Sequence, residues 1–217
     1  ASDDTTAICW DVTAEAQLCT LTGHKDFVRS GALSPASPHL FATGSYDHAV
    51  KLWDVRANRC VMTLKHVAPV EDVLPLPGGG MLASASGNTL TVRSLTRSHN
   101  SPLHFCLNLA APLSLSLSLR QVWDILMGKI LNAITAHSKT ITSLCRDASA
   151  THLLSGSLDR SVKAYELSTG QVVGVIKYDA PVLCIALSPM NTHLVAGTTD
   201  SCLTVRRKKV GQAKASA

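Results

Sequence analysis

The stretch HLFATGSYDHAVKLWDV, residues 39–55, decides the fold. Apolar and β-branched residues stand on both sides of a polar turn at residues 46–48, and the second half ends in the pair Trp53-Asp54. This pattern is typical of two antiparallel strands joined by a tight turn. No window of the chain carries a sustained apolar stripe at helical spacing. The sequence therefore predicts an all-β protein.

The same pattern returns along the chain at a fixed interval. An aspartate stands six residues before a position that holds tryptophan or a substitute for it: Asp4 and Trp10, Asp47 and Trp53, Asp159 and Tyr165, Asp200 and Arg206. A second marker precedes the later units, at His24, His66, His137 and Asp179. Most successive tryptophan positions are 41 to 43 residues apart. A period near 42 residues indicates a repeat architecture.

One interval is too long. Trp53 and Trp123 are 70 residues apart, and removing residues 92–121 shortens the interval to 40 and restores the strand pattern. The codons for LSLSLSL, residues 113–119, can form a pyrimidine tract, and both edges of the segment fit splice-site triplets. We interpret residues 92–121 as a retained intron; the alternative is an unstructured loop, although loops of this length are uncommon.

The markers resemble the WD40 repeat, in which four strands form one blade of a β-propeller. The resemblance implies a partial propeller, with about four blades plus a starting strand out of a ring of seven, in a chain that is a fragment. The expected organisation is WD40 blades at 1–91, the insert at 92–121, further blades at 122–209 and a tail at 210–217.

In WD40 proteins a His, a Ser or Thr, an Asp and a Trp bond to one another within a blade, because buried polar groups need partners. Carried over, the resemblance implies two such locks: His24, Thr43, Asp47 and Trp53; and His137, Ser155, Asp159 and Tyr165. The other two units carry substitutions at the lock positions: Ala83 and Gly87 after His66, and Ala196 and Arg206 in the last unit. We expect weaker locks there.

The run VRSGALSP, residues 28–35, and the similarity through residues 194–209 resemble a family of WD40 proteins of the small-subunit processome. This resemblance implies a non-catalytic scaffold in ribosome biogenesis, located in the nucleus and nucleolus. The role implied for this scaffold is to support pre-18S rRNA processing and rRNA transcription. The implied partners are other processome proteins and the pre-rRNA or U3 snoRNP. Two alternatives stay open: a WD40 protein-interaction adaptor outside the nucleolus, and a module that binds RNA directly.

The net charge of +5 comes from the C-terminal stretch, and the rest of the chain is balanced. Four of its residues are candidate RNA contacts: Arg206, Arg207, Lys208 and Lys209. The alternative is a solvated chain end without a role. Further candidates on the predicted surface are Lys51, Arg56, Arg59 and Arg160.

Motifs of catalysis and cofactor binding are absent from the sequence, including G-x-S-x-G, H-E-x-x-H and G-x-x-x-x-G-K-[ST]. The seven cysteines are scattered without a C-x-x-C pair, which argues against disulfides or zinc and favours a reducing compartment. The longest apolar region, residues 103–119, is too short and too polar to span a membrane comfortably. We therefore predict a soluble, intracellular non-enzyme without catalytic, cofactor-binding or metal-binding residues.

Overall fold

The computed structural model describes residues 1–77, 81–94, 123–124 and 130–207. Its strands form five antiparallel sheets in chain order, with one short parallel addition. The first is the hairpin β1 (Ala7–Asp11) and β2 (Ala16–Leu21). The second is β3 (Val28–Ser34), β4 (Ser37–Ser45), β5 (Ala49–Asp54) and β6 (Arg59–Lys65). The third is β7 (Val70–Pro75), β8 (Met81–Ser86), β9 (Thr89–Ser94) and β11 (Ile130–Thr135), with β10 (Trp123–Asp124) also beside β9. The fourth is β12 (Ile141–Arg146), β13 (His152–Ser157), β14 (Ser161–Glu166) and β15 (Val172–Lys177). The last is β16 (Val182–Leu187), β17 (His193–Thr198) and β18 (Leu203–Arg207).

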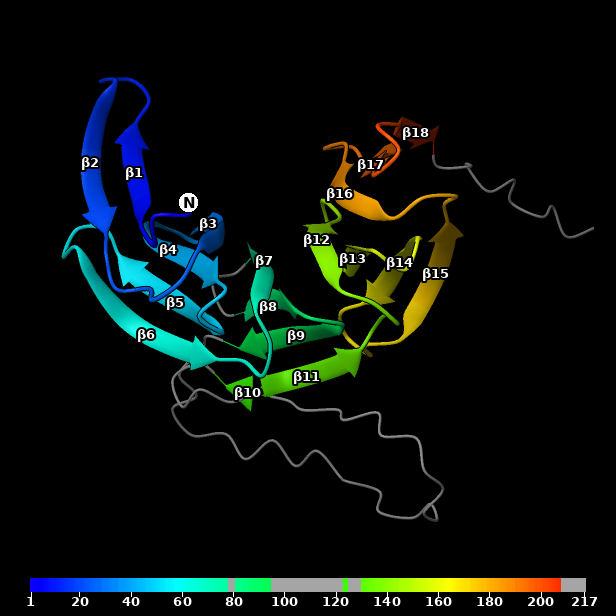
Figure 1. Cartoon of the computed structure of the whole chain (residues 1–217), viewed down its shortest axis with the longest axis horizontal. Helices are drawn as coiled ribbons and strands as arrows, with labels where there is room; N and C mark the ends of the chain where they lie inside the picture. Colours follow the sequence, from blue (N-terminus) through cyan, green and yellow to red (C-terminus); the bar gives the residue numbers. More distant parts are fainter. Residues whose placement is uncertain (78–80, 95–122, 125–129, 208–217) are drawn as a thin grey trace, which may run out of the picture.

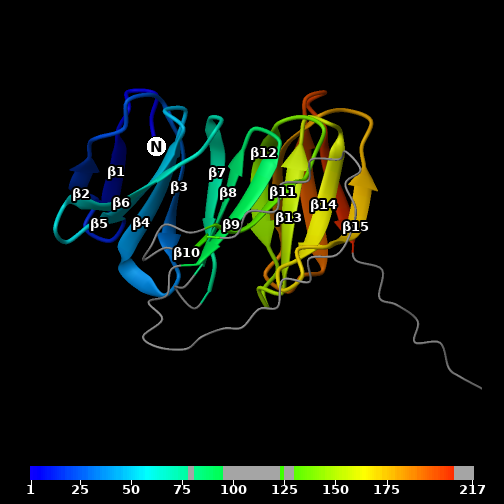
Figure 2. The same ribbon diagram turned by 90° about the horizontal axis from the view of Figure 1, so that it is seen from below.

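The sheets stand one after another along an arc (Figure 1) and appear side by side, like blades, when the molecule is seen from below (Figure 2). The first strands of the four later sheets, β3, β7, β12 and β16, line the inside of the arc, whereas β6, β11 and β15 lie on its outside. The arc is open between the β1–β2 hairpin and β18. The predicted fold, a partial all-β propeller, is confirmed.

An aspartate side chain organises the turn between the second and third strands of a blade. Asp47 Oδ1 accepts the Ala49 N–H at 3.0 Å, and Asp159 Oδ1 accepts the Ser161 N–H at 3.0 Å. The residue after each aspartate, His48 or Arg160, adopts the left-handed conformation with φ of 64° or 67°. A three-residue turn that ends in a left-handed residue matches the twist of the flanking strands.

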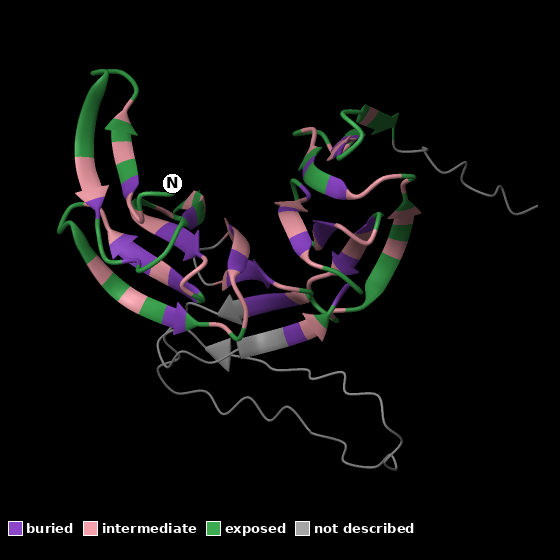
Figure 3. Ribbon diagram, in the orientation of Figure 1, coloured by how far each residue is buried: buried purple, intermediate pink, exposed green. Residues whose placement is uncertain are grey.

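Apolar side chains fill the space between consecutive blades. Val50 and Leu52 of β5 pack with Val70 and Val73 of β7 in one buried cluster. A side chain on Gly44 would come within 2.7 Å of a Val70 methyl carbon, so the glycine lets β7 approach β4 closely. Buried residues accordingly concentrate where sheets face each other (Figure 3). Each blade therefore depends on its neighbours for much of its burial.

Within the described part of the chain, the face of β18 that carries Leu203 and Val205 is uncovered. Strand register places Leu203 and Val205 at the positions that Val50 and Leu52 hold in β5. Val50 and Leu52 are 0% and 4% exposed, whereas Leu203 and Val205 are 70% and 59% exposed. At the other end of the arc, Trp10 is 58% exposed. Apolar surface of this kind marks places where further structure packs.

The third sheet differs from the predicted domain boundaries. Val92, Arg93 and Ser94, assigned from the sequence to the insert, complete β9, and Val92 is buried. Val92 can complete the strand because it is the same residue type that Val122 would supply if residues 92–121 were absent. Trp123-Asp124 instead forms β10, parallel to the end of β9. Residues 95–121 lie outside the described part of the chain, so the insert stays a prediction.

Candidate interaction surface

The first predicted lock is assembled in the second sheet, with its four residues on β4, β5 and the connections beside them. Trp53 Nε1–H donates to Thr43 Oγ1 at 2.8 Å, and Thr43 Oγ1 lies 2.7 Å from His24 Nε2. His24 Nδ1 lies 2.8 Å from Asp47 Oδ2, which also accepts the Lys25 N–H at 3.0 Å. His24, Thr43 and Trp53 are buried. The lock therefore joins side chains that are 10 to 23 residues apart in the chain, two of them on strands and two in the connections.

The direction of these hydrogen bonds determines the tautomer of His24. Because Trp53 N–H donates to Thr43 Oγ1, the single hydroxyl proton of Thr43 is free to point at His24 Nε2. His24 then carries its proton on Nδ1 and donates it to Asp47. Burial lowers the pKa of His24 against the opposing effect of Asp47, which favours this neutral form. Burial acts to raise the pKa of Asp47, but the bonds from His24 and Lys25 hold it below its usual value.

The second predicted lock has the same histidine geometry and a different aromatic contact. His137 lies 2.7 Å from Ser155 Oγ through Nε2 and 2.8 Å from Asp159 Oδ2 through Nδ1. Tyr165 is buried, but its hydroxyl donates to the carbonyl of Ala136 at 3.3 Å. Burial raises the pKa of Tyr165 to about 12. The tyrosine thus fills the tryptophan position while it bonds to the backbone beside the histidine.

The third sheet corrects the expectation that Ala83 and Gly87 occupy its lock positions. The register of β8 against β7 places Ser84, not Ala83, at the position of Thr43, and Ser84 Oγ lies 3.3 Å from His66 Nε2. The difference arises because only residues 87–88 separate β8 from β9, one residue fewer than in the β4–β5 turn. Counting four residues back from Gly87, as Thr43 stands four residues before Asp47, therefore selected Ala83, one residue before Ser84.

In the last sheet the substitutions go further than the weaker lock expected from the sequence, because its described residues do not form the hydrogen-bonded chain. Ala196 stands at the Thr43 position, and Asp179 at the histidine position is exposed. Arg206 occupies the tryptophan position, with its guanidinium carbon 5.1 Å from the centre of the Tyr178 ring. Arg206 also donates to the Lys177 carbonyl at 3.5 Å. An arginine–aromatic contact thus replaces the hydrogen-bonded chain.

A belt of side-chain hydrogen bonds links the inner strands β3, β7 and β12, and the sequence analysis did not predict it. The third residue of β3, β7 and β12 accepts a backbone N–H from the next blade: Ser30 from Val73, Asp72 from Leu144, and Ser143 from Ile185. Asp72 also accepts the Ser30 hydroxyl at 2.6 Å, so it joins three blades. Burial raises the pKa of Asp72 despite these bonds. A register shift lies directly before each of these three residues, and sequence patterns do not mark it.

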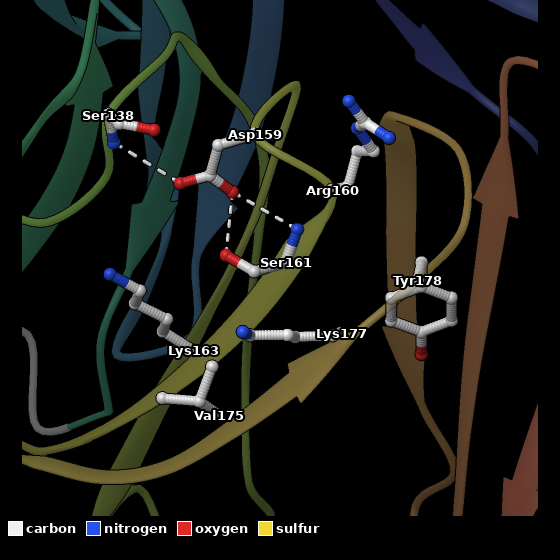
Figure 4. A pocket seen from close by; sticks show the side chains of 8 residues that line it. All are labelled: Ser138, Asp159, Arg160, Ser161, Lys163, Val175, Lys177 and Tyr178. Carbon is white, nitrogen blue, oxygen red and sulfur yellow. Dashed lines mark hydrogen bonds between the residues drawn. The ribbon is translucent and has the colours of Figure 1, made fainter.

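A surface pocket of about 600 Å³ lies beside the second lock (Figure 4). Its lining comes from the β11–β12 connection, the β13–β14 turn, β14, β15 and the residue after β15: Ser138, Asp159, Arg160, Ser161, Lys163, Val175, Lys177 and Tyr178. In Figure 4 the Lys177 ammonium lies below Ser161 and the Lys163 ammonium lies to the left of Ser161, whereas the Arg160 guanidinium points upward, away from both lysines. We name this the lysine pocket. Of its residues, the sequence analysis predicted Arg160 as an RNA contact on the surface. It did not predict Lys163 or Lys177.

The remaining predicted RNA contacts are dispersed. Arg206 and Arg207 end β18 and are exposed, and Lys208 and Lys209 lie outside the described residues. Lys51 donates to Thr63 at 3.2 Å, Arg56 pairs with Asp54 at 3.6 Å, and Arg59 is exposed at the start of β6. The structure therefore brings Arg206 next to the lysine pocket, through Tyr178 and Lys177, and leaves Lys51, Arg56 and Arg59 apart from it.

The described residues were also compared with the patterns of metal sites and membrane-spanning helices. Among those residues, no three His, Cys, Asp or Glu side chains converge as metal ligands would. The same part of the chain has no helix that is long and apolar enough to cross a membrane.

Comparisons with known proteins match the repeat structure. The family model of the WD domain, G-beta repeat, matches residues 15–54, 128–166 and 170–205. The interval between the first two matches contains the third sheet's β7, β8 and β9, where the turn is short and the Trp-Asp pair is displaced.

Several curated proteins are similar to most of the chain. The U3 small nucleolar RNA-associated protein 15 homolog of Xenopus tropicalis is 36% identical over 214 residues, which cover 98% of this chain and 36% of that protein. The human homolog is 36% identical over 187 residues, with 86% and 30% covered. Protein SLOW WALKER 1 of Arabidopsis thaliana is 31% identical over 214 residues, with 96% and 35% covered. The chain thus spans about a third of the length of these relatives.

Proposed function

The chain belongs to the WD domain, G-beta repeat family, and from this premise we propose that it is a non-catalytic propeller scaffold in ribosome biogenesis. It supports nucleolar pre-18S rRNA processing, and with it rRNA transcription, as part of the small-subunit processome. The observation that carries the proposal is the 36% identity, over 98% of the chain, to a U3 small nucleolar RNA-associated protein 15 homolog. Its partners are other processome proteins and the U3 snoRNP with its pre-rRNA.

The geometry of the two histidines favours a scaffold function and argues against an acid–base catalytic site. Both ring nitrogens of His24 and of His137 are engaged inside the blades, and the histidine rings are buried. A general base needs a nitrogen within reach of a substrate proton. These histidines therefore serve to hold the turns and connections beside them in place.

Depletion of the protein tests this function. We expect uncleaved pre-18S precursor to accumulate after depletion, and expression of the intact protein to restore cleavage. Staining of the protein in cells should place it in the nucleolus. Normal precursor levels after complete depletion, together with a location outside the nucleolus, would instead support an adaptor of another assembly.

Direct RNA contact is the second candidate, and the juxtaposition of the lysine pocket with Arg206 favours it. The C-terminal cations can be tested apart from the fold. We expect replacement of Arg207, Lys208 and Lys209 with alanine to lower the salt dependence of RNA binding, by about 0.7 in the logarithmic slope per lost phosphate contact. Arg206 is left in place because its guanidinium covers Tyr178. An unchanged slope would identify this stretch as a solvated chain end.

A further inference from the structure

The lysine pocket has more positive charge than the protein neutralises. Its lining includes the cations Arg160, Lys163 and Lys177 and one carboxylate, Asp159. Asp159 Oδ2 receives bonds from His137 and the Ser138 N–H, and Oδ1 receives the Ser161 N–H and hydroxyl. With both oxygens engaged in this way, the carboxylate is held within the blade and does not pair with the lysines.

The cations themselves have capacity to bind an anion. Among the described residues, no hydrogen bond or ion pair is made by the side chain of Arg160 or Lys177. Lys163 donates one hydrogen bond to the Ala136 carbonyl at 2.8 Å, which leaves two of its three N–H groups. The hydroxyl of Ser138, on an exposed residue, adds a further possible donor at the same rim. This set of donors matches the oxygens of a phosphate group.

The equivalent lysines of the second sheet are arranged differently. Lys51 occupies the position of Lys163, and its ammonium donates to Thr63 at 3.2 Å and lies 6.0 Å from the centre of the Trp53 ring. The fourth sheet has Val175 at the Thr63 position, so the lysine there loses its hydroxyl partner. The substitution of a threonine by a valine is what leaves Lys163 directed at the pocket and the Ala136 carbonyl.

We propose that the lysine pocket binds phosphate groups of single-stranded RNA. The cations continue beyond the pocket, because Arg206 stacks on Tyr178 and donates to the Lys177 carbonyl, and Arg207 follows at the exposed end of β18. Cations on two adjacent blades fit a polyanion with repeated phosphates better than a single small anion. The proposal deepens the RNA-binding candidate and rests on the proposed role in pre-rRNA processing for its natural ligand.

A pair of double variants tests the site in the whole protein. K163A/K177A removes the two pocket lysines, and K51A/K65A removes two lysines from the same strand positions of the second sheet. The net charge changes equally in both. The probe is a fluorescein-labelled 20-nucleotide oligouridine, measured by fluorescence anisotropy over a series of salt concentrations.

We expect K163A/K177A to weaken binding roughly tenfold and to reduce the logarithmic salt slope by about 1.4, as the loss of two phosphate contacts requires. K51A/K65A should stay within about twofold of the unmodified protein. Equal losses in the two variants, or no loss in either, would overturn the proposal. R160A/K177A, which removes only side chains without protein partners, provides the same test if loss of the Lys163 bond perturbs folding.

A 20-residue polyglutamate peptide measured in parallel distinguishes RNA from an acidic protein segment. If the peptide binds as tightly as the RNA and K163A/K177A weakens both equally, the pocket serves acidic protein segments and the RNA assignment is wrong. Failure of the site is separable from failure of the scaffold function. Loss of the pocket without loss of RNA binding refutes the site alone, whereas normal precursor levels after depletion refute the scaffold function alone.

Discussion

Replacement of Thr43 by valine should destabilise the protein about twice as much as replacement of Ser155 by alanine. Thr43 Oγ1 serves two buried partners, Trp53 Nε1–H and His24 Nε2, at 2.8 and 2.7 Å. Ser155 Oγ serves His137 Nε2, while the Tyr165 hydroxyl bonds to the Ala136 carbonyl. A valine preserves the shape of the threonine side chain but leaves both partners without a hydrogen bond.

The magnitude follows from the cost of a buried polar group without a partner, about 1–3 kcal/mol. Two such groups give an expected loss of about 4 kcal/mol for Thr43→Val, and one gives about 2 kcal/mol for Ser155→Ala. Thr43→Ser keeps the hydroxyl and removes one buried methyl group, which should cost about 1 kcal/mol. The order Thr43→Val, Ser155→Ala, Thr43→Ser is therefore the expected ranking.

Urea unfolding of the whole protein, followed by circular dichroism, measures these differences, provided that the denaturant dependence is the same in each variant. Thr63→Val is the matched control, because Thr63 is an exposed threonine on the same sheet and its loss should change stability by less than about 0.5 kcal/mol. A Thr43→Val protein no less stable than the Ser155→Ala protein would refute the assignment of two buried partners to one hydroxyl.

Three further perturbations have expected outcomes. Burial lowers the pKa of His24 and His137, so unfolding takes up protons at acidic pH. The free energy of unfolding should therefore decrease as the pH falls below about 6.5, by at most about 2.7 kcal/mol per pH unit for the two histidines. A free energy of unfolding that rises between about pH 6.5 and pH 5 would contradict this. Asp72→Ala should lower the melting temperature more than Asp72→Asn, because an asparagine oxygen still accepts the Leu144 N–H; equal shifts in calorimetry would rule out the belt. Deletion of residues 92–121 should raise the melting temperature, by about 2–4 °C per kcal/mol of stability gained, because it restores the Trp-Asp ending of the third strand. A lower melting temperature after the deletion, together with transcripts that retain the segment, would show that residues 92–121 are a true part of the blade.

Sequence patterns predicted the elements whose partners are close in the chain. A hairpin has its register fixed by a short turn, so Asp47 and Trp53, six residues apart, could be placed on one blade from their spacing. The same spacing placed Asp159 and Tyr165, and both histidine contacts followed from the family resemblance. Where the turn was one residue shorter, the same counting selected Ala83 instead of Ser84.

The sequence by itself determined the all-β repeat and its period, because these depend on local alternation and on fixed distances within a hairpin, whereas the two locks were implied by the family resemblance. Only the tertiary structure decided the contacts between blades. Asp72 meets Ser30 and Leu144 across 42 and 72 residues, and the lysine pocket combines segments from both ends of a four-stranded sheet. Such contacts depend on how twisted sheets pack against one another, and a side chain's neighbours in that packing are not encoded by the residues beside it in the chain.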